Sequence, residues 1–127
     1  MKTDVRVAVI GLGKIGLPLA LTLSENGCKV YGVDVSGDVV DRLNSGISHV
    51  DEPGIVEKLT MALKSDSFTA TTDLKLALMK CNFVVIAVPL YVNSNNAPDY
   101  SAIDEVTAEI GRNIQEGTTV VFETTLP

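Results

Sequence analysis

The chain has 127 residues, 46 % of them hydrophobic, which is the size and composition of one compact domain. Its formal net charge is −6, with a pI near 4.6. Nucleic acids and anionic membrane surfaces attract basic proteins, so this charge argues against both as partners. A phosphate ligand of so acidic a chain would have to be bound by backbone N–H groups rather than by a cluster of lysines.

Two further features bear on the compartment. No apolar run approaches the roughly 18 residues of a membrane span, and the first residues show no signal-peptide pattern. The two cysteines, Cys28 and Cys81, form one pair at most and have no neighbouring histidine. We expect both to pack in the core rather than to form a disulfide or act as nucleophiles. We therefore expect a cytoplasmic protein.

In the first half of the chain, strand and helix patterns alternate. A valine-rich strand is predicted over residues 5–10, followed by a helix from Lys14 to about Asn26 that Gly27 closes. A second strand covers residues 29–33. Two helices then follow, over residues 38–44 and 54–64. The acids and proline of Asp51-Glu52-Pro53-Gly54 predict an N-terminal cap for the second of these helices.

The second half continues the alternation. A short strand is predicted over residues 68–71, a helix over 73–80, and a strand over 83–88, whose unbroken apolar run is typical of a parallel strand covered on both faces. A polar loop follows from Asn93 to Asp99. Ser101 is expected to cap a helix whose apolar stripe is Ile103, Val106, Ile110 and Ile114, with Asp104, Glu105 and Glu109 on its solvated face. The last strand covers residues 118–123.

Five strands joined by helical crossovers predict an α/β fold. We expect a doubly wound, Rossmann-like parallel sheet with strand order 3-2-1-4-5 and helices on both faces. The ligand crevice should lie beside strands one and four. A complete enzyme of this type would continue into a substrate domain after the fifth strand. We therefore expect residues 1–127 to be one NAD-binding domain, a fragment that lacks the central and C-terminal domains of its parent.

The most informative motif is Gly11-Leu-Gly13-Lys14-Ile15-Gly16, between the first strand and the first helix. Gly11 suits the tight turn, Gly13 leaves room for a pyrophosphate, and Gly16 lets the helix lie close to the sheet. The start of the helix offers unpaired N–H groups to phosphates. Asp34, 18 residues beyond Gly16, can accept hydrogen bonds from an adenosine ribose. A carboxylate there repels a 2′-phosphate, so the motif predicts NAD rather than NADP.

Other candidates follow strands four and five, at the ends where open α/β sheets bind ligands. Val88-Pro89-Leu90 and Thr125 stand there. Thr125 could hydrogen-bond a ribose, a nicotinamide amide or a catalytic water, or it could satisfy its own turn. His49, the single histidine, is expected to be an ordinary loop residue. No residues form an acid–base pair, a metal site or an activated nucleophile, so we predict no catalytic residue, beyond a supporting role for Thr125, and no metal.

Taken together, the motifs resemble the nucleotide-sugar dehydrogenases, the UDP-glucose/GDP-mannose dehydrogenase family. The matching segments occur in the family's order: residues 11–20, 32–34, 43–46, 52–54, 71–73, 85–89, 97–99 and 123–127. The resemblance implies a homo-oligomeric, NAD-dependent enzyme of polysaccharide biosynthesis that oxidises a nucleotide sugar at C6, in two steps, through a cysteine-bound intermediate. The family's catalytic cysteine lies in a later motif, which neither Cys28 nor Cys81 matches.

The resemblance also implies residue roles. Ile15 would contact the cofactor beside the glycines, Asp34 the adenosine ribose, and Thr125 the active-site side of the cofactor. Two positions depart from the family: Leu90 replaces a threonine, and Val39 replaces a basic residue.

Ile15-Gly-Leu-Pro18 is more similar to the UDP-N-acetylhexosamine branch, such as UDP-N-acetyl-mannosamine dehydrogenase, than to the UDP-glucose branch. Two alternatives to the family remain open. One is a β-hydroxyacid dehydrogenase, which can share the glycine motif and its proline. The other is a non-catalytic, nucleotide-sensing regulatory module.

Overall fold

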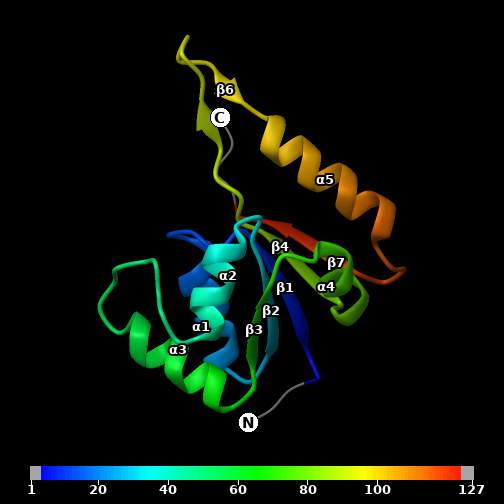
Figure 1. Ribbon diagram of the computed structural model, residues 1–127. Helices are drawn as coiled ribbons and strands as arrows, with labels where there is room; N and C mark the ends of the chain where they lie inside the picture. Colours follow the sequence, from blue (N-terminus) through cyan, green and yellow to red (C-terminus); the bar gives the residue numbers. More distant parts are fainter. Residues whose placement is uncertain (1–3, 124–127) are drawn as a thin grey trace.

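A computed structural model describes residues 4–123, which are built around a five-stranded parallel sheet of order β3-β2-β1-β4-β7 (Figure 1). The strands of this sheet are β1 (Arg6–Ile10), β2 (Lys29–Val33), β3 (Phe68–Thr71), β4 (Phe83–Ile86) and β7 (Thr119–Phe122). Every neighbouring pair in the sheet is parallel. Since β7 is the fifth strand of the sheet in chain order, the predicted order and the predicted fold are confirmed.

Helices cover both faces of the sheet, as predicted (Figure 1). The first face carries α1 (Gly16–Glu25), α2 (Gly37–Asn44) and α3 (Ile55–Lys64), and the second carries α4 (Leu74–Lys80) and α5 (Ser101–Asn113). The pleat of β1 divides its side chains between the two faces. Val7 and Val9 therefore join the core under α1–α3, whereas Ala8 and Ile10 join the core under α4 and α5.

Two helices begin at side-chain caps that satisfy a free N–H group of the first turn. The Ser36 hydroxyl accepts from the Val39 N–H at the start of α2, and Asp73 accepts from the Leu76 N–H at the start of α4. Two predicted caps are wrong. Gly54, with φ +81°, precedes α3 and no side-chain bond caps that helix. Ser101 lies inside α5, where its N–H and hydroxyl donate to Asp99.

The predicted polar loop over residues 93–99 is partly wrong as well. A short hairpin stands there, made of β5 (Tyr91–Val92) and β6 (Pro98–Asp99), and it projects from the sheet beside α5 (Figure 1). Its turn is closed by the Asn93 side chain, which accepts from the N–H groups of Asn95 and Ala97. Two ends also differ from prediction: α1 begins at Gly16 rather than Lys14, and β4 ends at Ile86 rather than Val88.

The cysteines lie on opposite faces of the sheet and are both free thiols. Cys81 is buried, and this burial raises the pKa of its thiol to about 11. Cys28 is half-buried against the other core. The prediction that both pack in the core is confirmed. Within residues 4–123, no helix combines the length and the apolar character that crossing a membrane requires.

Candidate cofactor site

Gly11 forms the tight turn that leads from the end of β1 toward α1. Its φ is +99°, a conformation that favours glycine, and its N–H donates to the Val33 carbonyl at 2.8 Å. A Cβ at this position would lie only 2.9 Å from the carbonyl carbon and oxygen of Ala87. Gly11 is therefore packed against the backbone that follows β4, at the carboxyl edge of the sheet.

The other two glycines of the motif differ from each other. A Cβ on Gly16 would lie 1.6 Å from the Gly11 carbonyl oxygen, so a side chain there would push α1 off the turn. A Cβ on Gly13 would have no neighbour within 4 Å. No contact within the described structure therefore requires glycine at position 13. The missing side chain leaves space for a ligand beside the backbone.

The turn after Gly11 offers free hydrogen-bond donors. Among the described residues, nothing accepts a hydrogen bond from the backbone N–H groups of Gly13, Lys14 and Ile15. All three residues are exposed, and the Ile15 side chain is 62 % exposed. These N–H groups precede α1, whose dipole places partial positive charge at the same end. The arrangement suits an anion such as a pyrophosphate.

Asp34 is joined to the glycine turn, although 22 residues separate it from Leu12. One carboxylate oxygen accepts from the Leu12 N–H at 3.1 Å, and the other accepts from the Ser36 N–H at 3.0 Å. The carboxylate is half-buried. Each oxygen keeps acceptor capacity, because a carboxylate oxygen has two lone pairs. The side chain can therefore bind ribose hydroxyls while it also holds the turn in place.

Leu12 itself is a contributor that the sequence analysis did not single out. Its side chain is fully buried and lies over Gly32, where an added Cβ would approach Leu12 Cδ2 to 2.8 Å. Gly32 in the middle of a strand is the sequence signal for this close approach. The buried side chain fixes the turn to the core under α1–α3.

His49, predicted to be an ordinary loop residue, lies in the loop between α2 and α3 and contacts the glycine turn. Its Nε2 atom lies 2.6 Å from the Leu12 carbonyl oxygen. Between this loop and the glycine turn lies an open pocket of about 640 Å³, lined by Gly13, Lys14, His49, Val50, Asp51 and Glu52. The contact joins residues 37 positions apart, so no local spacing in the sequence could indicate it.

The remaining predicted residues lie on the other side of the turn or beyond it. Val88 is half-buried and its backbone nitrogen lies 3.0 Å from the position of an added Gly11 Cβ, so the structure brings it to the turn. Pro89 is exposed, and half-buried Leu90 leads away into the hairpin. Thr125 lies outside the described residues. Within residues 4–123, no three His, Cys, Asp or Glu residues gather to hold a metal.

The fold and this site define a dinucleotide-binding domain of the Rossmann type. Comparison with known families identifies it further, since residues 5–127 match the NAD-binding domain of the UDP-glucose/GDP-mannose dehydrogenase family. The chain belongs to this family. The match confirms the predicted family and the predicted cofactor, NAD. It does not support the two alternatives, a β-hydroxyacid dehydrogenase and a nucleotide-sensing regulatory module.

Named relatives agree with this assignment. The chain is 31 % identical to UDP-N-acetyl-D-mannosamine dehydrogenase of Pyrococcus horikoshii, over 96 % of this chain and 29 % of the relative. It is 36 % identical to GDP-mannose 6-dehydrogenase of Pseudomonas aeruginosa, with the same coverage. A crystal structure of a ternary complex of GDP-mannose dehydrogenase from Pseudomonas aeruginosa superposes with a TM-score of 0.92, at 35 % identity, over 95 % of this chain and 28 % of that one. The chain thus spans less than a third of the length of these relatives.

Proposed function

We propose that the chain binds NAD as the cofactor domain of a nucleotide-sugar 6-dehydrogenase. Such an enzyme oxidises the C6 alcohol of a UDP- or GDP-linked sugar to the uronic acid in two successive steps, and each step would transfer one hydride to one molecule of NAD. The observation that supports this most is the pairing of two features in one turn. Free N–H groups at Gly13, Lys14 and Ile15 stand beside a carboxylate, Asp34, that is fixed to the same turn.

The proposal assigns roles along the crevice. Gly11, Gly13, Lys14, Ile15 and Gly16 receive the pyrophosphate, and Asp34 receives the adenosine ribose. The proposal assigns Val88, Pro89, Leu90 and Thr125 to the nicotinamide half of the cofactor. Leu90 has no hydroxyl, so only its backbone can bond there. Val39 packs against the core and cannot add the positive charge of a basic residue.

For the sugar substrate, we propose only its chemical class, a nucleotide-linked sugar. The relatives include enzymes named for UDP-N-acetyl-mannosamine and for GDP-mannose, at 31 % and 36 % identity, so identity does not separate these substrates. Ile15-Gly-Leu-Pro18 favours the N-acetylhexosamine branch. We further propose a cytoplasmic, homo-oligomeric enzyme that supplies uronic acids for polysaccharide biosynthesis.

Of the two thiols within residues 4–123, that of Cys81 is unsuited to nucleophilic attack. The pKa of Cys81 is raised to about 11 by its burial, so this thiol stays protonated at neutral pH. We therefore propose that the 127-residue chain by itself binds the cofactor without oxidising a nucleotide sugar. NADH formation from a UDP- or GDP-sugar by this chain, with contaminating enzyme excluded, would contradict that part.

The proposal is tested by calorimetric titration with NAD and NADP. We expect tighter binding of NAD, because Asp34 repels a 2′-phosphate. Asp34→Ala should weaken NAD binding by about 1–3 kcal/mol, the range for a lost charged hydrogen-bond partner. Asp38→Ala is the matched control, since Asp38 is an exposed acid whose ion pair is with Arg42 on the same helix. Equal or tighter binding of NADP, or an Asp34 variant that binds NAD unchanged, would overturn the assignment.

A further inference from the structure

We propose that His49 is a positioning residue of the cofactor site, which fixes the peptide between Leu12 and Gly13 for pyrophosphate binding. The proposal rests on the proposed function, because it needs a phosphate ligand at the glycine turn. Its basis is the contact between His49 Nε2 and the Leu12 carbonyl oxygen, 2.6 Å apart. This contact connects the loop between α2 and α3 to the turn between β1 and α1.

The Leu12 carbonyl and the Gly13 N–H belong to one planar peptide unit and point in opposite directions. A bond that fixes the carbonyl therefore fixes the direction of the N–H as well. Nothing in the described structure accepts from that Gly13 N–H, and a Cβ at Gly13 would meet open space. His49 thus orients a free donor toward the side where a ligand can approach, and a bonded carbonyl also makes the N–H of its own peptide a stronger donor.

Leu12 is held at three points, and His49 supplies the only one of the three that acts on this peptide unit. Asp34 accepts from the Leu12 N–H, which belongs to the preceding peptide. The Leu12 side chain is buried over Gly32. Neither of these two contacts prevents the peptide unit between Leu12 and Gly13 from rotating. The bond from His49 is what restricts it.

The loop is anchored so that it can present the imidazole. Val50, the next residue, is buried in the core under α1–α3. The Ser48 hydroxyl donates to the Val50 carbonyl at 2.7 Å and accepts from the Val50 N–H at 3.1 Å, which closes a tight turn around His49. The histidine is therefore carried by a fixed segment, although its own side chain is exposed.

The direction of the hydrogen bond follows from its partner. A carbonyl oxygen only accepts, so Nε2 must carry the proton. Both the neutral tautomer with Nε2–H and the imidazolium ion meet this condition. The charged groups that share the cavity are Lys14, Asp51 and Glu52. Neutral imidazole with its proton on Nδ1 is the form that the proposal excludes.

The first measurement is an imidazole ¹H–¹⁵N spectrum of the unliganded chain. His49 is the single histidine, so the spectrum needs no assignment. We expect the Nε2–H tautomer in the neutral ring, and a change in the Nε2 signal when ADP-ribose is added. Adenosine, which lacks the pyrophosphate, should leave the signal in place. A spectrum of the Nδ1–H tautomer would overturn the proposal without touching the proposed function.

The second measurement compares ligand binding by three variants. His49→Ala should weaken ADP-ribose binding roughly 3- to 10-fold, the factor that one hydrogen bond contributes, and leave adenosine binding unchanged. His49→Gln should restore binding, because the glutamine amide nitrogen reaches the position of Nε2. His49→Asn should not, because its amide nitrogen corresponds to Nδ1. Ile47→Ala, on the same loop with a side chain 53 % exposed, is the control and should bind both ligands as the unaltered chain does.

The outcomes separate this inference from the proposed function. Equal losses for ADP-ribose and adenosine, or a glutamine variant no better than alanine or asparagine, would overturn the positioning role alone. If the alanine variant does not fold, the comparison of the glutamine and asparagine variants decides the same question. Failure of the unaltered chain to bind ADP-ribose would overturn the proposed function together with this inference.

Discussion

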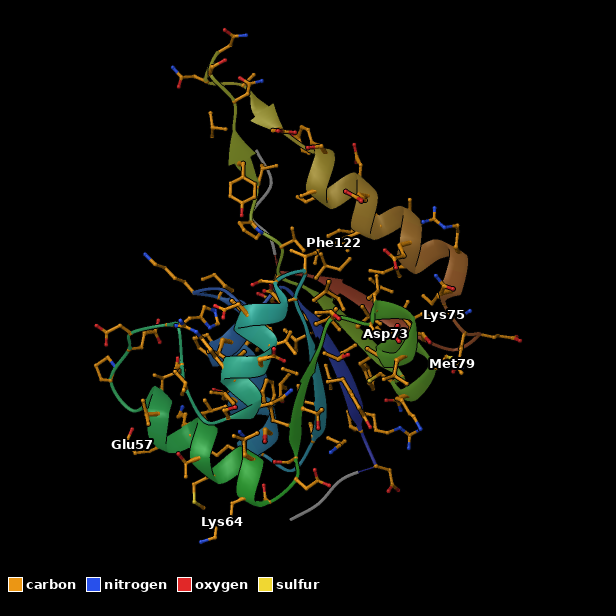
Figure 2. The ribbon with its side chains drawn as sticks, in the orientation of Figure 1. Glu57, Lys64, Asp73, Lys75, Met79 and Phe122 are labelled. Carbon is orange, nitrogen blue, oxygen red and sulfur yellow. The ribbon has the colours of Figure 1, made fainter. Side chains whose placement is uncertain are left out.

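The two edges of the sheet differ sharply in how they are covered. In β3, at one edge, Phe68 is 1 % exposed and Ala70 is 4 % exposed, and both lie in the core under α1–α3. In β7, at the other edge, Val121 is 40 % exposed and Phe122 is 47 % exposed. Figure 2 shows Phe122 on the side of α4 and α5, with Glu57 and Lys64 of α3 at the opposite side. The chain's own helices cover the β3 edge, whereas the β7 edge exposes apolar side chains to solvent.

The candidate site follows the same division. Gly11 and Gly13 follow the central strand β1, Asp34 follows β2, and His49 lies in the loop between α2 and α3. The core under α1–α3 supports this turn through the buried side chain of Leu12. The positions assigned to the nicotinamide half follow β4 and β7. Under the proposed function, adenosine and pyrophosphate would bind beside the core under α1–α3. The nicotinamide half would meet residues that follow β4 and β7, and in β7 the side chains of Val121 and Phe122 are largely exposed.

The largest expected effect compares one phenylalanine from each edge strand. Phe68→Ala should lower the free energy of unfolding by about 3–5 kcal/mol, because it empties a fully buried site. Phe122→Ala should lower it by less than about 1 kcal/mol, because nearly half of that side chain is already in water. Urea unfolding followed by circular dichroism measures both. Equal losses would remove the distinction between the edges.

A smaller effect is expected from the two glycines that differ in their surroundings. Gly16→Ala should lower the free energy of unfolding by about 1–3 kcal/mol, because its Cβ meets the backbone of Gly11. Gly13→Ala should leave stability within about 0.5 kcal/mol. The same Gly13 variant should nevertheless weaken ADP-ribose binding, because the new methyl group occupies the space proposed for the pyrophosphate. Unchanged ADP-ribose binding by Gly13→Ala would contradict the proposed pyrophosphate site at this turn.

The smallest effect concerns Cys81 and pH. Burial raises the pKa of its thiol from 9.0 to about 11 in the folded chain, so the unfolded chain loses this proton first. The stabilisation is complete below about pH 9 and is lost as the pH rises through 11, by at most about 3 kcal/mol, since each pKa unit corresponds to about 1.4 kcal/mol. The free energy of unfolding measured across this range should fall less steeply for Cys81→Ala than for the unaltered chain. An identical slope in both would contradict a buried, neutral thiol.

The sequence predicted the sheet and its strand order because each strand is an apolar run bounded by turn residues, as in residues 83–86. It located the glycine turn and Asp34 because their spacing along the chain reflects a local βαβ unit. It missed the β5–β6 hairpin, whose two-residue strands show no periodicity and whose turn depends on the Asn93 side chain. It did not indicate the contact between His49 and Leu12, because that bond depends on how a distant loop packs.

The central claim is that residues 4–123 hold a complete adenosine and pyrophosphate site on the well-covered side of the sheet. The most direct test is a pair of titrations of this 127-residue chain with ADP-ribose and with NAD. The claim predicts measurable binding of both, with affinities within about 1 kcal/mol of each other, because the nicotinamide adds few contacts to this domain. Binding of NAD more than about tenfold tighter than ADP-ribose, or binding of neither ligand, would contradict it.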